Sequence, residues 1–375
     1  MVEKPEHLRI AIIMAGGTGE RFWPFSRQNH PKQLLKLVGE SQTLLEEAID
    51  RLSPLIDPAH IFIATARNLQ VPIQKARIGI PDKNILGEPC KRNTSGCLAY
   101  ATAHLLARYS GDGSNLTAAV ITADHLIGDP DLFCRVAEAA LDTVERTNAL
   151  GTIGIVPTRP ETGYGYIEFA DISQPISGST KEIPFYRVLR FHEKPNRETA
   201  QRYIAGGRFL WNSGMFFWRV STFLAGLRKA APTMLEAISG MKKAILAEDE
   251  RKVETIFQSL ENISIDYALL EKTQDVIVTR GEFPWDDIGA WDTLARTRSR
   301  DADGNVTIGD PVVIDSRNCI VVNEPGADKI AVSVLGMDNL VVVVSKDAIL
   351  VTPKDRAQDV RQVVEELKRR SAKQI

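Results

Sequence analysis

Short apolar runs alternate with segments of helical periodicity over the first 300 or so residues of the chain. Runs rich in Ile and Val, each about as long as a buried strand, occupy Leu8–Met14, 60–64 and 118–122. Apolar residues recur at helical spacing in the segments between them, at 43–51, 95–108 and 131–147. Because parallel neighbouring strands need crossover connections, this alternation predicts an α/β protein with a doubly wound, mainly parallel sheet. Four further runs extend the predicted sheet, at 151–156, 186–191, 215–220 and 275–278.

The pattern changes after residue 301. Short apolar runs then follow one another between Asn, Gly and Asp turns, at 311–315, 319–323, 329–334 and 340–344, with no helical pattern until about residue 355. Residues 357–370 form an amphipathic helix pattern, in which Val360, Val363, Val364 and Leu367 share one face. We therefore predict two domains, an α/β domain over residues 1–300 and a small β module with a terminal helix over residues 301–375.

The apolar stripe of this terminal helix has to be buried against something. We expect it to pack on the α/β domain or to form a contact in a homodimer, and a frayed, solvated tail is the alternative. The stripe is only two turns long.

Composition narrows the classes of protein that the chain can belong to. The 375 residues carry a net charge of −2, which leaves no basic patch of the kind that binds nucleic acid or a membrane surface. The four cysteines show no Cys-x-x-Cys spacing, and no signal peptide or apolar run of about 18 residues is evident. We expect a soluble cytoplasmic protein with reduced thiols.

A glycine-rich turn follows the first predicted strand directly, with the sequence Ala15-Gly16-Gly17-Thr18-Gly19. Without side chains, the backbone N–H groups of this turn can approach a polyphosphate closely. Arg21 and Lys32 then supply positive charge at about the distance that a bound triphosphate would span. The glycine spacing of dinucleotide-binding folds is absent, as is the Gly-Lys-Ser/Thr of Walker A. A plain strand-to-helix turn is the alternative interpretation.

The whole stretch from Ile12 through Trp23-Pro24-Phe25-Ser26-Arg27 to Pro31-Lys32-Gln33 resembles the motif of sugar-nucleotide pyrophosphorylases. The resemblance is closest to the mannose-1-phosphate guanylyltransferase branch, and residues 352–360 resemble that branch as well. It implies a Rossmann-like nucleotide-diphospho-sugar transferase fold, followed by a short left-handed β-helix. It also implies that Ala15 to Gly19 bind the nucleotide, while Arg21 and Lys32 stabilise the triphosphate and the leaving pyrophosphate.

Two candidate metal ligands lie where the resemblance expects them. Asp124 and His125 come just after the strand at 118–122, and ligands of open α/β sheets bind outside the carboxyl ends of the strands. The Trp285-Asp286-Asp287 segment resembles the second carboxylate motif of the family, in which the register selects Asp287. Asp124 and Asp287 would hold Mg²⁺ together with substrate phosphates, Asp124 contacting the nucleotide too. A helix cap at Asp124 and a solvated turn at 286–287 are the alternatives.

A second set of residues resembles the sugar-phosphate site of the family. In the Glu193-Lys194-Pro195 motif, the carboxylate would contact sugar hydroxyls and Lys194 would grip and orient the sugar phosphate. Asn212 offers both a donor and an acceptor to hexose hydroxyls. Gly165 and Tyr166 belong to a segment whose glycine backbone binds the sugar in the family, and a simple hairpin is the alternative there.

The segment Gly87-Glu88-Pro89-Cys90-Lys91-Arg92-Asn93-Thr94 resembles the guanylyltransferase motif that lies beside the nucleotide. It implies that Glu88, Arg92, Asn93 and Thr94 bind the nucleotide, and a donor such as Arg92 or Asn93 suits the O6 of guanine. An N-cap formed by Asn93 or Thr94 is the structural alternative, compatible with another base.

Taken together, the motifs predict an enzyme that converts GTP and α-mannose 1-phosphate to GDP-mannose and pyrophosphate, with Mg²⁺ as cofactor. A phosphate monoester is already an anionic nucleophile at pH 7, so that no general base is needed. We expect a homodimer that binds neither nucleic acid nor membranes. The alternatives are a nucleotidylyltransferase for another hexose or heptose 1-phosphate, and a non-catalytic regulatory homologue that binds sugar nucleotide.

Overall fold

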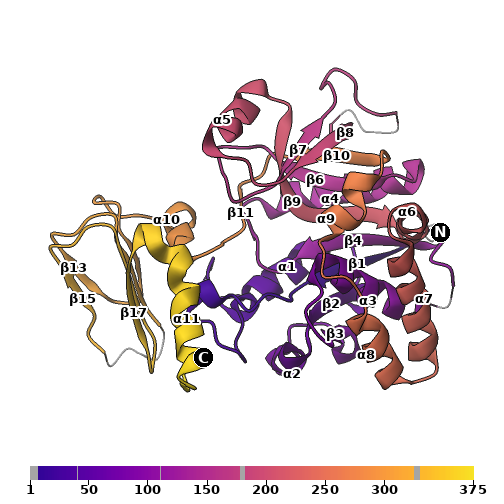
Figure 1. Cartoon of the computed structure of the whole chain (residues 1–375). Coiled ribbons are helices and arrows are strands. Elements are labelled where there is room, and N and C mark those ends of the chain that lie inside the picture. Colours follow the sequence, from indigo (N-terminus) through magenta and orange to yellow (C-terminus); the bar gives the residue numbers. More distant parts are fainter. Residues whose placement is uncertain (1–6, 40, 110, 178–181, 325–329) are drawn as a thin grey trace.

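The computed structural model describes residues 7–39, 41–109, 111–177, 182–324 and 330–375. Its largest sheet has nine strands in the order β3-β2-β1-β4-β9-β6-β10-β8-β7 (Figure 1). The strands of this sheet are β1 (Leu8–Met14), β2 (Ile61–Ala66), β3 (Ile85–Glu88), β4 (Leu116–Thr122), β6 (Leu150–Ile155), β7 (Tyr166–Phe169), β8 (Phe185–His192), β9 (Phe209–Arg219) and β10 (Val276–Gly281).

Helices cover both faces of this sheet, as the alternating pattern predicts. They are α1 (Leu44–Leu52), α2 (Arg67–Ala76), α3 (Asn93–Arg108), α4 (Pro130–Thr147), α5 (Arg197–Gly206), α6 (Val220–Ala230), α7 (Pro232–Leu246), α8 (Glu250–Gln258) and α9 (Ile265–Ala268). The short helix α10 (Leu294–Thr297) lies beside the β module instead. Among the residues that the structure describes, no helix is both long and apolar enough to cross a membrane.

The doubly wound α/β fold is confirmed, and the sheet combines parallel and antiparallel pairings. Strands β3, β2, β1 and β4 are parallel to one another, and β6 is parallel to β10. Strand β9 runs antiparallel between β4 and β6, and β7 and β8 add further antiparallel pairings. An apolar run buried on both faces looks the same in either direction, and the sequence pattern therefore does not distinguish these strands.

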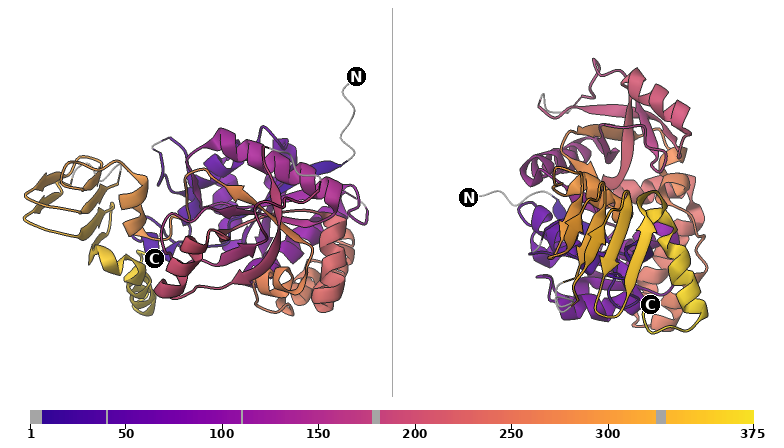
Figure 2. Two further views of the ribbon diagram at one scale, coloured as in Figure 1. Left: turned by 90° about the horizontal axis from the view of Figure 1, so that it is seen from above. Right: turned by 90° about the vertical axis from the view of Figure 1, so that its left-hand side faces the viewer.

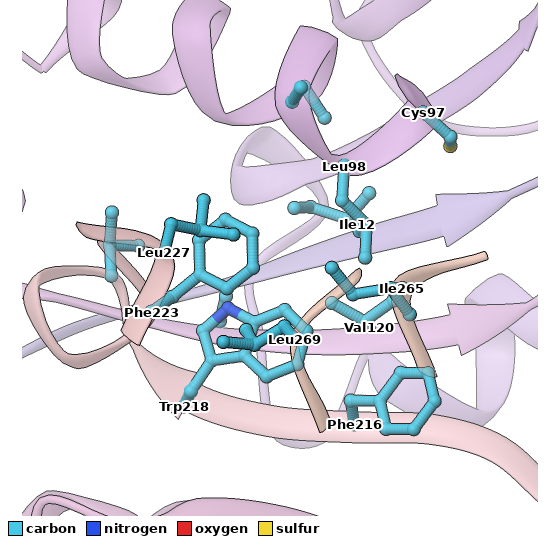
Figure 3. Packing of buried hydrophobic residues seen from close by; sticks show 14 of the residues in the cluster. Ile12, Cys97, Leu98, Val120, Phe216, Trp218, Phe223, Leu227, Ile265 and Leu269 are labelled. Carbon is cyan, nitrogen blue, oxygen red and sulfur yellow. The ribbon is translucent and has the colours of Figure 1, made fainter. Parts of the chain in front are cut away.

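Alternate residues of the central strands enter two separate cores. Ile10 and Ile12 of β1 face one core, while Ala11 and Ile13 face the other. Figure 3 shows part of the first core, where Ile12 and Val120 from the sheet lie among side chains of α3, α6 and β9. Both faces of the strands are thus sealed, and the polar residues that follow each strand are left at the sheet edge.

The C-terminal module has two small sheets, as expected for a short β-helix. One contains β12 (Val306–Ile308), β14 (Ile320–Asn323), β16 (Leu340–Val344) and β17 (Ile349–Pro353), and the other contains β13 (Val312–Ile314) and β15 (Ser333–Leu335). Apart from β17, which is antiparallel to β16, the strands pair in parallel from one coil to the next. Part of the predicted strand at 329–334 lies outside the described residues.

The terminal helix α11 (Val360–Arg369) begins three residues later than predicted, because Lys354–Asp359 forms a 3-10 turn. The helix runs along the junction between the module and the α/β domain (Figures 1 and 2). Val360 and Val364 belong to the same buried cluster as Phe22 and Trp291. Val363 was expected on the buried stripe, but it is 38% exposed, since it lies at the edge of the covered face.

Candidate active site

The glycine-rich turn after β1 packs against the segment that carries Lys32. Gly19 has a φ of +65°, and a Cβ added there would lie 2.2 Å from the Cβ of Lys32. Only glycine fits this position. The turn is also held by Ser26 Oγ, which donates to the Gly19 carbonyl at 2.7 Å, and by Gln33 Nε2, which donates to the Gly17 carbonyl at 2.8 Å. Two side chains from outside the turn, Ser26 and Gln33, therefore help to hold its backbone in place.

Lys32 connects the two segments that carry the predicted metal ligands. Its buried ammonium donates to the Asp124 carboxylate at 2.9 Å, to the Asp124 carbonyl at 3.2 Å and to the Asp287 carbonyl at 3.0 Å. An ammonium has three N–H donors, and all three are used here. Burial opposes ionisation of the Asp124 carboxyl, but the charge and hydrogen bond of Lys32 outweigh it and lower the pKa of Asp124.

A short strand pair joins the same two segments. Strand β5 (Leu126–Ile127) is antiparallel to β11 (Trp285–Asp286). His125 Nδ1 lies 2.6 Å from the Thr122 hydroxyl and accepts from Trp285 Nε1 at 3.2 Å. Desolvation lowers the pKa of His125 to about 4, so that the ring is neutral at physiological pH and its Nδ1 can accept from Trp285.

The two adjacent carboxylates at 286 and 287 have different surroundings. Asp286 is buried and pairs with Arg296 at 3.0 Å and with Arg159 at 3.4 Å. Asp287 accepts a hydrogen bond of 2.8 Å from the Tyr164 hydroxyl and has no ion pair within 4.0 Å among the described residues. Burial raises the pKa of Asp287, and the nearby charges of Asp286 and Asp124 add to this.

These surroundings fit a divalent cation between Asp124 and Asp287. A bound cation would relieve the burial and like-charge repulsion that raise the pKa of Asp287. Within the described ranges, no group of three or more His, Cys, Asp or Glu side chains is placed to hold a metal. Two carboxylates completed by phosphate oxygens and waters form the donor set that Mg²⁺ commonly takes in phosphoryl-transfer sites.

A cavity of about 830 Å³ opens beside the glycine-rich turn. The side chains and backbone around it come from the carboxyl ends of β1, β2, β3 and β4 and from the start of α3, and include Gly16, Gly17, Thr18, Arg67, Glu88, Cys90, Lys91, Asn93, Thr94 and Thr122. Its volume suits a nucleotide, and its position is the one that the strand order predicts.

Arg92 takes a different direction from the other residues of its motif. It does not line the cavity, and its guanidinium donates to the carbonyl oxygens of Gln258 and Lys91. Asn93, with a φ of +56°, begins α3 and faces the cavity, while Thr94 Oγ1 accepts from the backbone N–H of Ile265. The structure thus brings Glu88, Asn93 and Thr94 to one cavity and leaves the Arg92 side chain outside it.

Glu88 is the carboxylate that faces this cavity among the described residues. It is buried, and burial raises its pKa to about 7, opposed only partly by its hydrogen bond with Cys97. Glu88 has no ion pair within 4.0 Å in the part of the chain that the structure describes, so that its buried carboxyl is poised to accept hydrogen bonds from a ligand that brings its own donors.

Several of the predicted sugar residues gather around Gly165, which directly precedes β7. A Cβ on Gly165 would lie 3.3 Å from Glu193 Oε1, just after β8, and 3.6 Å from the Cβ of Asn212 in β9, so that Gly165 lies close to both residues. The Asn212 amide nitrogen donates to Asp266 Oδ1 at 2.8 Å, and its oxygen accepts from the backbone of Gly214 at 3.1 Å. These bonds fix the orientation of the Asn212 side chain.

Two other predicted residues differ in their accessibility. Lys194 is exposed, has a φ of +35° and lies 4.0 Å from Glu193. Tyr166, by contrast, is completely buried, and its hydroxyl donates to the Glu161 carbonyl at 2.8 Å. Because alternation along β7 directs the Tyr166 side chain into the core, this residue can face a sugar only through its backbone.

Three residues near the site were missed by the sequence analysis. Tyr164 binds Asp287, Arg159 packs over the Tyr164 and Trp211 rings, and Asp266 binds Asn212. Tyr164 directly precedes the predicted residues Gly165 and Tyr166, and it could have been chosen there. Asp266 and Arg159 lie in segments without a recognisable motif.

A doubly wound sheet with a glycine-rich turn and two carboxylates near its carboxyl edge is the arrangement expected of a nucleotide-dependent transferase. In agreement, residues 10–304 match the model of the nucleotidyl transferase family. Residues 309–367 match the MannoseP isomerase/GMP-like β-helix domain. The chain is a nucleotidyl transferase with a β-helix module.

Known proteins narrow this class further. The chain is 39% identical to the mannose-1-phosphate guanylyltransferase of Klebsiella pneumoniae, and the match covers 96% of this chain and 74% of the relative. It is 37% identical to the alginate biosynthesis protein AlgA of Pseudomonas syringae, and that match covers 95% of this chain and 71% of the relative. A crystal structure from Thermus thermophilus, described as mannose-1-phosphate geranyltransferase, superposes with a TM-score of 0.82 at 36% identity, covering 96% and 99% of the two chains. The chain therefore belongs to the mannose-1-phosphate guanylyltransferase family.

Proposed function

We propose that this protein transfers GMP from GTP to α-D-mannose 1-phosphate and releases pyrophosphate and GDP-mannose. The observation that carries the proposal is the Lys32 ammonium, which joins the Asp124 and Asp287 segments beside the glycine-rich turn. Relatives at 36–39% identity over most of the chain are named for this activity, which supports the choice of substrates.

The reaction forms one P–O bond and breaks another. A phosphate oxygen of the sugar phosphate attacks the α-phosphorus of GTP in line, and the bridging oxygen to the β-phosphorus leaves with its electron pair as pyrophosphate. The nucleophile is already ionised near pH 7, so that no side chain has to remove a proton. Catalysis then depends on positioning and on stabilisation of negative charge.

Separate groups of residues would carry these tasks. The backbone of Ala15 to Gly19 and the guanidinium of Arg21 would hold the triphosphate, and Lys194 would orient the sugar phosphate. The Lys32 donors are engaged with protein oxygens, and contact with a phosphate would require one of these bonds to exchange. Asp124 and Asp287 would hold Mg²⁺, which when bound neutralises phosphate charge.

Base selection would rest on Glu88 and its neighbours Asn93 and Thr94. The Watson–Crick edge of guanine carries two adjacent donors, N1–H and N2–H, which a carboxylate can accept together. The same carboxylate would repel the O4 of uracil or thymine. A Glu88→Gln variant should therefore discriminate less between GTP and ITP, because inosine lacks the N2 donor.

We infer that the active protein is a cytoplasmic homodimer. Exposed apolar side chains on the C-terminal module, including Val312, Ile314, Leu335 and Met337, support association of two copies. Light scattering of the purified protein tests this directly, and a monomer at micromolar concentration would refute it.

The experiment that tests the main proposal is an assay of pyrophosphate release against GTP, ATP, UTP and dTTP, each paired with mannose, glucose and other hexose 1-phosphates. We expect turnover to be fastest with GTP and mannose 1-phosphate and to stop when Mg²⁺ is chelated. Faster turnover of another pair would identify a different sugar or base. Binding of sugar nucleotide without turnover of any pair would identify a regulatory homologue.

A further inference from the structure

The Trp23-Pro24-Phe25-Ser26-Arg27 segment, which marked the family in the sequence, turns its two largest polar side chains away from the nucleotide cavity. Trp23 Nε1 donates to the carbonyl oxygen of Gln374 at 2.8 Å. Arg27 Nη1 donates to the same oxygen at 2.7 Å. One backbone carbonyl near the end of the chain is thus bound by two residues that follow the glycine-rich turn Ala15–Gly19, which is the phosphate loop of the proposed function.

Arg27 also binds the β module itself. Its Nη2 lies 2.6 Å from the Asp347 carboxylate and 3.3 Å from the Ser345 hydroxyl, in the turn between β16 and β17. The Arg27 side chain is mostly covered, at 18% exposure, and its guanidinium packs 5.7 Å from the centre of the Trp23 ring. A partly buried arginine with three separate acceptors is a specific anchor rather than a solvated surface group.

The terminal helix makes a further connection on the other side of Arg21, where Lys368 of α11 pairs with Glu20 at 2.5 Å. Trp291, which precedes the β module, adds a hydrogen bond of 2.9 Å from its Nε1 to the Trp23 carbonyl. A small cavity of about 40 Å³ lies within this junction. It is lined by Thr18 of the phosphate loop, by Val364 and Lys368 of α11 and by the C-terminal residue Ile375, among others.

We infer that this junction, formed by Glu20, Trp23, Arg27, Lys368 and Gln374, is a positioning device for the phosphate loop. The inference rests on the proposed function. The junction anchors the chain immediately before and shortly after Arg21, the residue proposed to hold the triphosphate. The C-terminal module therefore acts on nucleotide binding without supplying a residue that touches the nucleotide.

The physical reason lies in the composition of the loop. Gly16, Gly17 and Gly19 lose much backbone entropy when the loop adopts one conformation, and a Cβ on Gly16 would find no atom within 4 Å to pack against. One conformation of the loop therefore has to be stabilised by contacts with residues outside it. An ordered loop then binds the triphosphate without a further loss of entropy, whereas the sugar phosphate site on β8 and β9 is unaffected.

Three full-length or nearly full-length variants test the inference: Arg27→Gln, Trp23→Phe and deletion of residues 374–375. Arg356→Gln is the matched control, since the ion pair of Arg356 within the described part of the chain is with Asp359 of its own turn, at 2.9 Å. We expect the three variants to raise the KM for GTP about tenfold while the KM for mannose 1-phosphate stays within about twofold. Trp23→Phe keeps an aromatic ring and removes the donor, which guards against a general failure to fold.

Amide hydrogen exchange of residues 15–22 in the ligand-free variants provides a readout that does not depend on turnover. Exchange there should accelerate about tenfold in the three variants and stay unchanged in the control. Unchanged exchange of the loop amides, or an equal rise in the KM of both substrates, would overturn the inference. The junction would then only hold the β module against the α/β domain. Absence of turnover in the parent protein would refute the proposed function, while the exchange result would still decide the role of the junction.

Discussion

The Lys32 ammonium lies 2.9 Å from the carboxylate of Asp124 and is almost completely buried beside it. This ion pair sits at the edge of the parallel half of the sheet, between the glycine-rich turn and the segment that carries the second carboxylate. Lys32 also binds the main chain of that second segment, so that this side chain, together with the β5–β11 pair, holds the segments of the two carboxylates side by side.

The adjacent carboxylates at 286 and 287 should respond differently to neutralisation. We predict that Asp124→Asn and Asp287→Asn each lower kcat by at least about a hundredfold, as expected when stabilisation of transition-state charge is removed. Asp286→Asn should change kcat much less. It should instead lower the free energy of unfolding by about 1–2 kcal/mol, because Asp286 accepts from Arg159 and Arg296. Steady-state kinetics and urea unfolding separate the two effects, and a larger kcat loss from Asp286→Asn would contradict this assignment.

The two phosphate-binding tasks should also separate kinetically. Lys194 is exposed at the sugar end of the site, whereas Arg21 donates to the Gly289 carbonyl close to the carboxylates. Lys194→Ala should raise the KM for mannose 1-phosphate by more than the KM for GTP, and Arg21→Ala should mainly lower kcat. Arg202→Ala, an exposed change on α5, serves as the control. Equal changes in both KM values for Lys194→Ala would count against the division.

The sequence predicts the position of this site better than its internal contacts. Asp124 follows β4 closely, where a ligand at the carboxyl edge of the sheet is expected. Lys32 and Asp287 reach it from segments outside the nine-stranded sheet, which the family motifs predicted and strand position did not. The hydrogen bond from Tyr164 to Asp287 and the one from Asn212 to Asp266 join segments far apart in the chain. No local pattern encodes such pairs, because they depend on how the segments pack.

Strand direction and side-chain exposure show the same limit. The apolar run of β9 predicts a buried strand but not its antiparallel insertion between β4 and β6. A resemblance carries a motif but not the direction of each side chain, and Arg92 and Tyr166 accordingly point elsewhere. In the sequence, Trp23 and Arg27 only indicate the family, whereas the structure shows that both side chains bind the Gln374 carbonyl.

Glu88 should give the protein a measurable dependence of stability on pH. Burial raises its pKa from an ordinary 4.5 to about 7, so that the folded state binds more protons than the unfolded state between these values. The stabilising contribution of protonated Glu88 is therefore complete below about pH 4.5 and is lost as the pH rises through 7, amounting to about 3 kcal/mol. Glu88→Gln removes this titration. Urea unfolding at pH 5 and pH 7.5 should show a smaller loss of stability in the variant, and parallel losses in both proteins would show that Glu88 ionises normally.

The last prediction concerns the way α11 is attached. Val360 and Val364 are buried in the cluster that contains Phe22 and Trp291, while Val363 on the same helix is 38% exposed. Val364→Ala should lower the free energy of unfolding by about 1–2 kcal/mol, since it leaves a cavity in a shared core. Val363→Ala is the matched control, because it also replaces a β-branched residue of the same helix by alanine. It should change the free energy of unfolding by no more than about 0.5 kcal/mol.

Truncation after Arg300 extends the same argument from one side chain to the whole module. It would expose the catalytic-domain half of the cluster, including Phe22, Trp23 and Trp291, to water. We expect the truncated protein to aggregate or to unfold at a lower temperature, because soluble domains rarely expose a large contiguous apolar surface to water. Scanning calorimetry and light scattering measure both effects. A truncated chain with the thermal midpoint, mass and activity of the full protein would show that α11 and the β module do not stabilise the catalytic domain.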